Sequence, residues 1–150
     1  MDGLSAAASG IAVVSLALQL VGSVREIHRF LHSISEAPEE LKRLLDLLEQ
    51  LEFILEQVGK LVQTQRGNRR LEESGVLKSV IRAISTCESK LAMLEGVVEA
   101  TKRVSADSSR ARRTLASIKL ACKKNDIREM EQKLNEAVNL LGLTMMANLT

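Results

Sequence analysis

The chain has almost no aromatic residues: Phe30 and Phe53 are its only two, and it contains neither tryptophan nor tyrosine. Hydrophobic residues nevertheless make up 45% of its 150 positions, which predicts a core of Leu, Val, Ile, Ala and Met. A chain of this length buries roughly 70% of its unfolded surface, so such a core needs no disulfide or metal. Because side chains that stack on bases are nearly absent, nucleic acid is not an expected partner.

Proline and glycine are also scarce, with one proline and eight glycines in the chain. So few turn-forming and helix-breaking residues argue against a sheet of short strands and favour long helices. The two cysteines, Cys87 and Cys122, have no spacing typical of metal ligands. We expect them to be reduced, small residues of a helical core, with a disulfide between them as the alternative.

The chain lacks a strong net charge, since 21 Lys and Arg stand against 19 Asp and Glu, for a formal charge of +2. The charges are nevertheless unevenly placed, with a net charge of −4 over residues 1–63 and +6 over residues 64–150. Either the two halves neutralise each other inside one bundle, or a basic surface remains to bind acidic lipid headgroups or an acidic partner. Both interpretations stay open.

Much of the positive excess lies between residues 102 and 124. These side chains form either a solvated helix face or a contact with acidic lipid or a partner. The candidates for that contact are Lys102, Arg103, Arg110, Arg112, Arg113, Lys119, Lys123 and Lys124.

Apolar residues recur at steps of three and four along the whole chain, which is the period of amphipathic helices. Helices are predicted over residues 3–34, 39–62, 77–103, 111–122 and 127–145. Pro38 separates the first two, Gly67 is an expected C-cap, and Asp107 and Asn125 are expected N-caps. The predicted fold is all-α, an antiparallel four-helix bundle in one domain over residues 1–150. Its fourth position is either continuous or split, giving four or five helices.

The first predicted helix is apolar around most of its girth. Residues 3–24 hold no charge, and 22 helical residues span about 33 Å, close to the roughly 30 Å hydrocarbon core of a bilayer. Its first third is small and weakly hydrophobic, and the acidic Asp2 argues against a secretory signal. Three interpretations stay open: a central bundle helix, a bundle helix that also inserts, and a permanent membrane span. The candidates for membrane insertion are Leu4, Ile11, Val13, Val14, Leu16, Leu18, Leu20, Val21 and Val24.

Catalytic or metal-binding constellations are not found. His28 and His32 are four residues apart, but no glutamate between them completes a zinc protease motif, so we interpret them as histidines of a polar face or of a helix end. Glu49, Glu52 and Glu56 lie along one side of the second helix, and we expect them to pair with lysines and arginines. The sequence therefore predicts no enzyme, no cofactor and no metal.

The last predicted helix ends in LLGLTMMANLT, which is apolar on all sides and has no polar tail. Such an ending predicts a domain cut from a longer chain, or a hydrophobic end that needs a partner.

The opening MDGLSAAASGIAVVSLALQL, the break EAPEE and the leucine-rich helix after it resemble the N-terminal, HeLo-like or SesA-type domain of fungal STAND (NLR-like) proteins. The later stretch RRTLASIKLACKKNDIREMEQKLNEAVNLL is similar to the closing section of that domain. The resemblance spans nearly the whole chain and is most specific over residues 1–20. A common form of the pattern has a tryptophan in the basic helix, where Leu115 or Ile118 stands here.

The resemblance implies an effector domain that executes or transmits regulated cell death in heterokaryon incompatibility and innate immunity. Its implied partners are other copies in an activated homo-oligomer, anionic membrane lipids, and the nucleotide-binding and repeat domains that follow in a full chain. The implied location is the cytoplasm, with recruitment to the plasma membrane on activation, where residues 4–24 form a pore or otherwise permeabilise the bilayer. The alternative is a helical adaptor that binds other copies or partner proteins without touching lipid.

Overall fold

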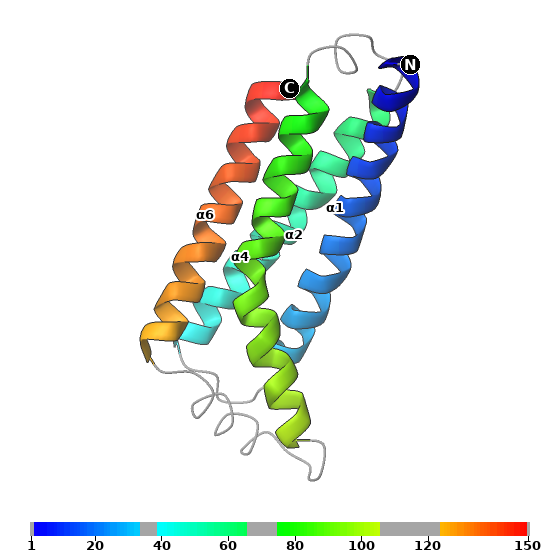
Figure 1. Cartoon of the computed structure of the whole chain (residues 1–150). Helices are drawn as coiled ribbons and strands as arrows, with labels where there is room; N and C mark the ends of the chain where they lie inside the picture. The colour runs from blue at the N-terminus through cyan, green and yellow to red at the C-terminus, as the bar shows by residue number, and fades with distance from the viewer. Residues whose placement is uncertain (1, 34–38, 66–74, 106–123, 150) are drawn as a thin grey trace.

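Four helices make up the part of the chain that the computed structural model describes. Their backbones cover residues 2–33, 39–65, 75–105 and 124–149, and side chains are described over 10–33, 39–65, 75–102 and 126–149. The helices are α1 (Asp2–His32), α2 (Glu39–Thr64), α4 (Val76–Ser105) and α6 (Lys124–Asn148). Successive helices run in opposite directions along one bundle (Figure 1). The predicted all-α, antiparallel four-helix bundle is confirmed.

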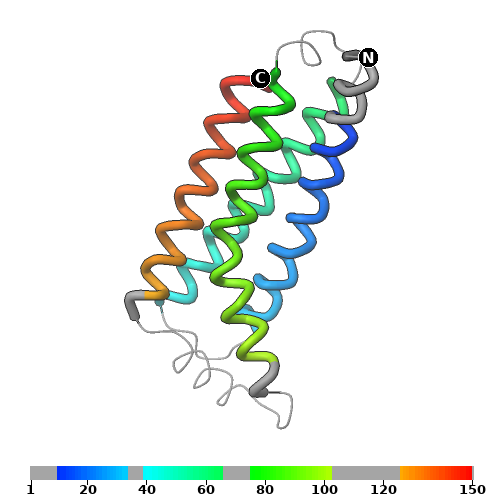
Figure 2. Tube along the Cα trace, viewed as in Figure 1, coloured from blue at the N-terminus to red at the C-terminus, as the bar shows by residue number. Residues whose placement is uncertain are grey.

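The order of helices around the bundle differs from their order along the chain. α1 and α6 each pack against both α2 and α4, whereas no contacts join α1 to α6 or α2 to α4 within the described helices. The neighbours α1 and α4 therefore run parallel, as do α2 and α6 (Figure 2). α1 is thus one wall of the bundle with two neighbours, and it packs more extensively on α2 than on α4.

The core is aliphatic, as the composition predicts. On α2 the buried side chains follow steps of three and four residues, which place them on one face of the helix. They are Leu41, Leu44, Leu48, Leu51, Leu55, Val58 and Val62. Stripes of the same kind run along α4 and α6, while Phe30 is half-buried and Phe53 is exposed.

The helix ends lie close to their predicted positions. α1 ends at His32, and the hydroxyl of Ser33 donates a hydrogen bond of 2.6 Å to the carbonyl oxygen of Phe30. α4 follows Gly75, whose φ of +73° lies in the left-handed region that glycine adopts without strain. The expected N-cap Asn125 is wrong, because α6 begins at Lys124 and Asn125 lies inside its first turn. The expected caps Gly67 and Asp107 and the predicted helix over 111–122 lie outside the described residues.

Cys87 is a reduced core residue, as predicted, whereas Cys122 lies outside the described residues. The thiol of Cys87 packs between α4 and α6 and donates a weak hydrogen bond of 3.5 Å to the carbonyl oxygen of Ala137. Burial raises the pKa of the Cys87 thiol to about 12. The thiol is therefore protonated at neutral pH and is not a nucleophile.

Candidate functional site

The bundle divides the nine candidates for membrane insertion between its core and its surface. Four of them are buried: Val13, Leu20, Val21 and Val24. Val14 and Leu16 are half-buried. Ile11 and Leu18 are 53% and 63% exposed, and the side chain of Leu4 lies outside the described ones.

Within the described side chains, the exposed face of α1 carries no charge between Ile11 and Gly22. Ile11 and Leu18 are seven residues apart and share this face with Ser15 and Gly22, which are also exposed. Among the described helices, one stretch, Gly10–His32, is long and apolar enough to cross a membrane, and 39% of an apolar 18-residue window within it is buried. A core helix of a soluble protein passes the same criterion. An ordinary core helix, however, does not need an exposed apolar face, and α1 has one.

α1 and α2 approach closely where both carry small residues. Gly59 of α2 is buried, and a Cβ built on it would lie 3.7 Å from the Cβ of Ala17 on α1. Further along, the guanidinium of Arg25 donates hydrogen bonds of 2.5 Å to both Glu52 and Glu56. The hydrogen bond and charge of Glu52, followed by those of Glu56, raise the pKa of Arg25. Because Arg25 is exposed to water, these ion pairs align the two helices more than they stabilise them.

These contacts confirm that Glu52 and Glu56 pair with a basic side chain, as we expected for that side of the second helix. Glu49, the third acid of that set, is exposed to solvent.

The contact between α1 and α4 is polar and less closely packed. Two cavities of about 160 and 150 Å³ lie along it, and Ser23 of α1 and Glu95 of α4 line both. The carboxylates of Glu26, Glu88 and Glu99 line one or the other. Burial raises the pKa of Glu95, and the charges of Glu88 and Glu99 raise it further. α1 is therefore closely fitted to α2 and weakly complementary to α4.

Glu95→Gln is expected to stabilise the bundle at neutral pH. A carboxyl group with a raised pKa binds its proton more tightly in the folded chain, so its contribution to stability falls as the pH rises through that folded pKa. The variant should gain a few tenths of a kcal/mol at pH 7, the size of one repulsive i,i+4 pair, and nothing near pH 3. Urea denaturation at both pH values measures this. Glu49→Gln is the control, and a loss of stability at pH 7 in Glu95→Gln would contradict the assignment.

The histidines lie where a polar face predicts them. The rings of His28 and His32 stack with centroids 5.8 Å apart and an interplanar angle of 21°. His28 is half-buried and His32 exposed, which confirms their interpretation as polar-face residues. Within the described ranges, no group of three or more His, Cys, Asp or Glu side chains is arranged to hold a metal ion.

The basic candidates are placed only in part. The ammonium of Lys102 lies 5.6 Å from the ring centroid of Phe30, a cation–π contact, and 4.0 Å from a carboxylate oxygen of Glu99. Arg103 and Lys124 belong to α4 and α6, but their side chains are not described. The remaining candidates lie outside the described residues: Arg110, Arg112, Arg113, Lys119 and Lys123. A shared basic surface stays a prediction.

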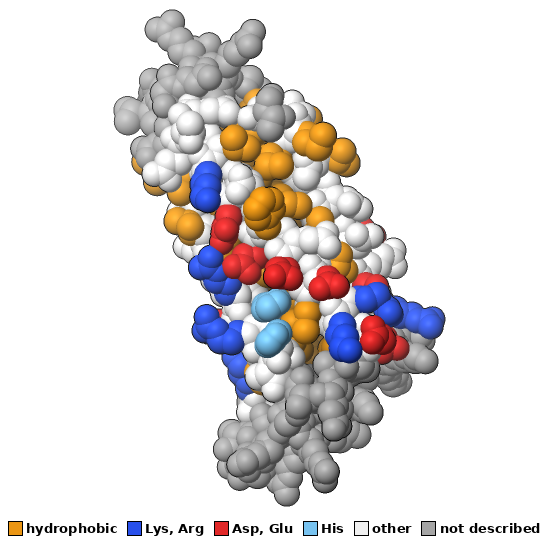
Figure 3. All heavy atoms as spheres, turned by 180° about the vertical axis from the view of Figure 1, so that it is seen from behind, with side chains coloured by type: hydrophobic (Ala, Val, Ile, Leu, Met, Phe, Trp, Pro, Cys, Tyr) orange, Lys and Arg blue, Asp and Glu red, His pale blue; other side chains and the backbone are white. Residues whose placement is uncertain are grey.

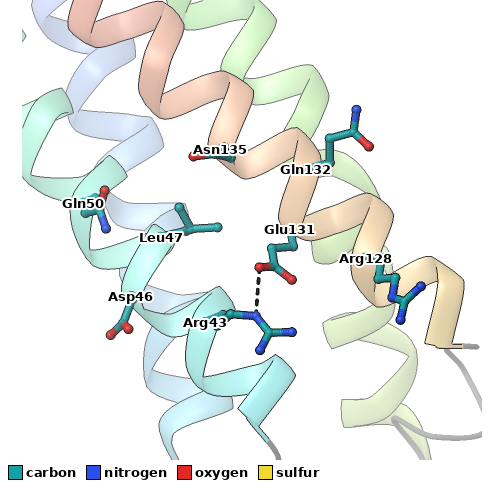
Figure 4. A pocket seen from close by; sticks show the side chains of 8 residues that line it. All are labelled: Arg43, Asp46, Leu47, Gln50, Arg128, Glu131, Gln132 and Asn135. Carbon is teal, nitrogen blue, oxygen red and sulfur yellow. Dashed lines mark hydrogen bonds and ion pairs between the residues drawn. The ribbon is translucent and has the colours of Figure 1, made fainter.

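A polar groove of about 550 Å³ separates the parallel neighbours α2 and α6. Figure 4 shows Arg43 of α2 directed toward Glu131 of α6, and the two side chains form an ion pair of 2.9 Å. Arg128, Asp46 and three amide side chains supply most of the remaining lining. Because two positive and two negative side chains line the groove, no class of ligand is favoured there.

Three exposed hydrophobic residues were not among the sequence candidates. Phe53 on α2 is 62% exposed, and Leu143 and Met146 on α6 are 67% and 66% exposed. The apolar ending of the last helix was the sequence feature that could have identified Leu143 and Met146. Figure 3 shows hydrophobic side chains gathered over the upper half of one face, with charged and histidine side chains mostly below them.

Comparison with known families gives one match. Residues 14–141 match a family model described as SesA, an N-terminal domain on NACHT NTPases and P-loop NTPases. The matched residues include all of α2 and α4 and most of α1 and α6. The match indicates no catalytic family. No curated protein and no solved structure matches the chain.

Proposed function

The chain belongs to the SesA family, whose domains stand N-terminal to NACHT or P-loop NTPase domains, and we propose that it is the membrane-permeabilising effector of an NLR-like protein. It rests in the cytoplasm as a bundle, self-associates when the full protein is activated, and permeabilises the plasma membrane through α1. Regulated cell death is the outcome of that step. The observation that carries the proposal is the exposed, charge-free face of α1 around Ile11 and Leu18.

The resting bundle retains α1 because one face of that helix belongs to the core. Val13, Leu20 and Val24 are at most 5% exposed, and burying an aliphatic side chain contributes about 1.5–3 kcal/mol. A monomer that released α1 would expose these side chains and the core residues they cover. Neighbouring copies in an oligomer would cover both, and the small residues near the start of α1 allow helices to approach closely in lipid. Self-association therefore favours release.

Dye release from phosphatidylserine-containing vesicles tests the proposal, with Leu18→Glu as the informative variant. Leu18 is 63% exposed in the bundle, so the added carboxylate leaves the resting fold intact. A charged side chain at the centre of a membrane helix costs about 3 kcal/mol, so release should fall by roughly 100-fold. Phe53→Glu is the matched control, because Phe53 is equally exposed but lies on α2, and its release should equal that of the wild type.

The same assay distinguishes the proposed function from the alternative role as an adaptor. Undiminished release from Leu18→Glu would mean that α1 is not the membrane element. If the wild-type oligomer releases no dye at all, the domain acts by binding other copies or partner proteins. Size-exclusion chromatography of each variant separates loss of membrane activity from loss of self-association.

A further inference from the structure

One end of the bundle differs in character from the rest. Two contacts identify residues at the same level: the side-chain amide of Gln65 donates a hydrogen bond of 2.8 Å to the carbonyl oxygen of Leu149, and Ala17 lies beside Gly59. α1 begins and α6 ends near this end, at the top of Figure 1. We call it the apolar end, comprising the described residues 10–21 of α1, 57–65 of α2, 75–85 of α4 and 140–149 of α6.

The apolar end holds four of the five large hydrophobic residues that are exposed in the described chain. Ile11 and Leu18 lie on α1, and Leu143 and Met146 lie on α6. The fifth, Phe53, lies nearer the middle of the bundle on α2. Aliphatic side chains are therefore presented at two opposite corners of the same end.

The charged side chains of the apolar end have one sign. Lys60 on α2 and Lys78 and Arg82 on α4 are exposed, and no carboxylate lies among the described residues of this end. The ion pairs that join described helices lie at the middle of the bundle or beyond it, as between Arg25 and Glu52 and between Lys90 and Glu136. Among the side chains described at this end, exposed cations and exposed aliphatic groups thus occur together without a carboxylate.

We propose that the apolar end is the surface with which the folded bundle docks on an acidic lipid bilayer, before α1 leaves the core. Aliphatic side chains favour the interfacial region of a bilayer, and lysines and arginines favour anionic headgroups. The groups surround the end of the bundle on all four helices, which suits a planar surface better than the single face that a protein partner contacts. The inference rests on the proposed function, because docking here brings the beginning of α1 to the bilayer (Figure 1). Lys102, of the basic candidates, lies at the opposite end of the bundle.

Vesicle co-sedimentation of the purified chain tests the cations. Each cation near an anionic surface strengthens binding about fivefold, so the triple variant Lys60→Gln, Lys78→Gln, Arg82→Gln should bind phosphatidylserine–phosphatidylcholine vesicles about 100-fold more weakly. The matched control removes three exposed cations from the other end of the bundle, by Arg29→Gln, Lys42→Gln and Arg128→Gln. The control should bind like the wild type, and wild-type binding should weaken as salt is added.

A second pair of variants tests the aliphatic groups without altering α1. The double variant Leu143→Ser, Met146→Ser should weaken binding to the same vesicles about tenfold, because two exposed apolar side chains no longer enter the interface. Phe53→Ser, outside the apolar end, should bind like the wild type. Circular dichroism shows that each variant retains its helices.

The outcomes separate this inference from the proposed function. Equal losses in the two triple variants, or equal wild-type binding to pure phosphatidylcholine vesicles, would overturn the docking surface. If the wild type causes no dye release but binds through Lys60, Lys78 and Arg82, the proposed function fails and the docking surface stands. If the wild type releases dye while the apolar-end variants bind vesicles normally, the docking surface fails and the proposed function stands.

Discussion

Leu20→Glu is expected to lower the free energy of unfolding by at least about 4 kcal/mol, which approaches the whole stability of a typical small domain. Leu20 is 5% exposed and belongs to the core, so a glutamate there would be buried without a partner for its charge. Urea denaturation followed by circular dichroism should show a midpoint at much lower urea concentration than that of the wild type at neutral pH. Lowering the pH should restore part of the stability, because a protonated carboxyl group is cheaper to bury.

Leu18→Glu is the control for this prediction, because Leu18 is only two residues away and 63% exposed. Its denaturation curve should match that of the wild type within about 0.5 kcal/mol. Equal stability of the two variants would contradict the orientation of α1 in the bundle. The contrast also shows that Leu20 is unsuitable for testing membrane insertion, since any loss of dye release there would report unfolding.

Gly59→Leu is expected to destabilise the bundle by about 1–3 kcal/mol, while Gly59→Ala stabilises it by about 0.5–1 kcal/mol. A Cβ at position 59 lies 3.7 Å from the Cβ of Ala17, an ordinary van der Waals distance, and alanine removes the entropic cost of glycine in a helix. The larger leucine side chain has no room between α1 and α2 and would force the two helices apart. The same denaturation experiment measures both variants.

Gly59→Leu and Gly59→Ala, which are expected to change the stability in opposite directions, also test the release of α1. If separation of α1 from α2 limits dye release, Gly59→Leu should release dye faster than the wild type and Gly59→Ala more slowly. Gly96→Leu on α4 is the control, because a Cβ on Gly96 meets no atom within 4 Å. A destabilised Gly59→Leu variant with unchanged release would mean that the contact with α2 does not limit the process.

The sequence predicts α2 well and the orientation of α1 poorly. Along α2, one stripe from Leu41 to Val62 is apolar and the opposite face is polar, so hydrophobic burial alone determines which side faces the core. On α1, two apolar stripes compete, and neither composition nor spacing distinguishes Leu18 from Leu20. The packing of α2 and α4 decides between them, and that information lies in residues distant along the chain.

The arrangement around the bundle depends on nonlocal contacts in the same way. The acidic side of α2 predicted a basic partner, but only the level at which α1 meets α2 identifies Arg25 as that partner. Leu143 and Met146 belong to a segment that is apolar on every side, so their exposure follows from Leu141 and Leu149 occupying the core. No local sequence pattern predicts that α2 and α6 pack side by side in parallel.

The alternation of helix directions has an electrostatic consequence for the apolar end. A helix carries about half a positive charge at its N-terminus and half a negative charge at its C-terminus. α1 and α4 begin at this end, whereas α2 and α6 finish there, so the four helix dipoles nearly cancel. The electric potential that a bilayer would meet is therefore determined by side chains. Among the described residues of that end, these are Lys60, Lys78 and Arg82. Their exchange for neutral residues would remove the positive potential, and their exchange for acidic residues would reverse it.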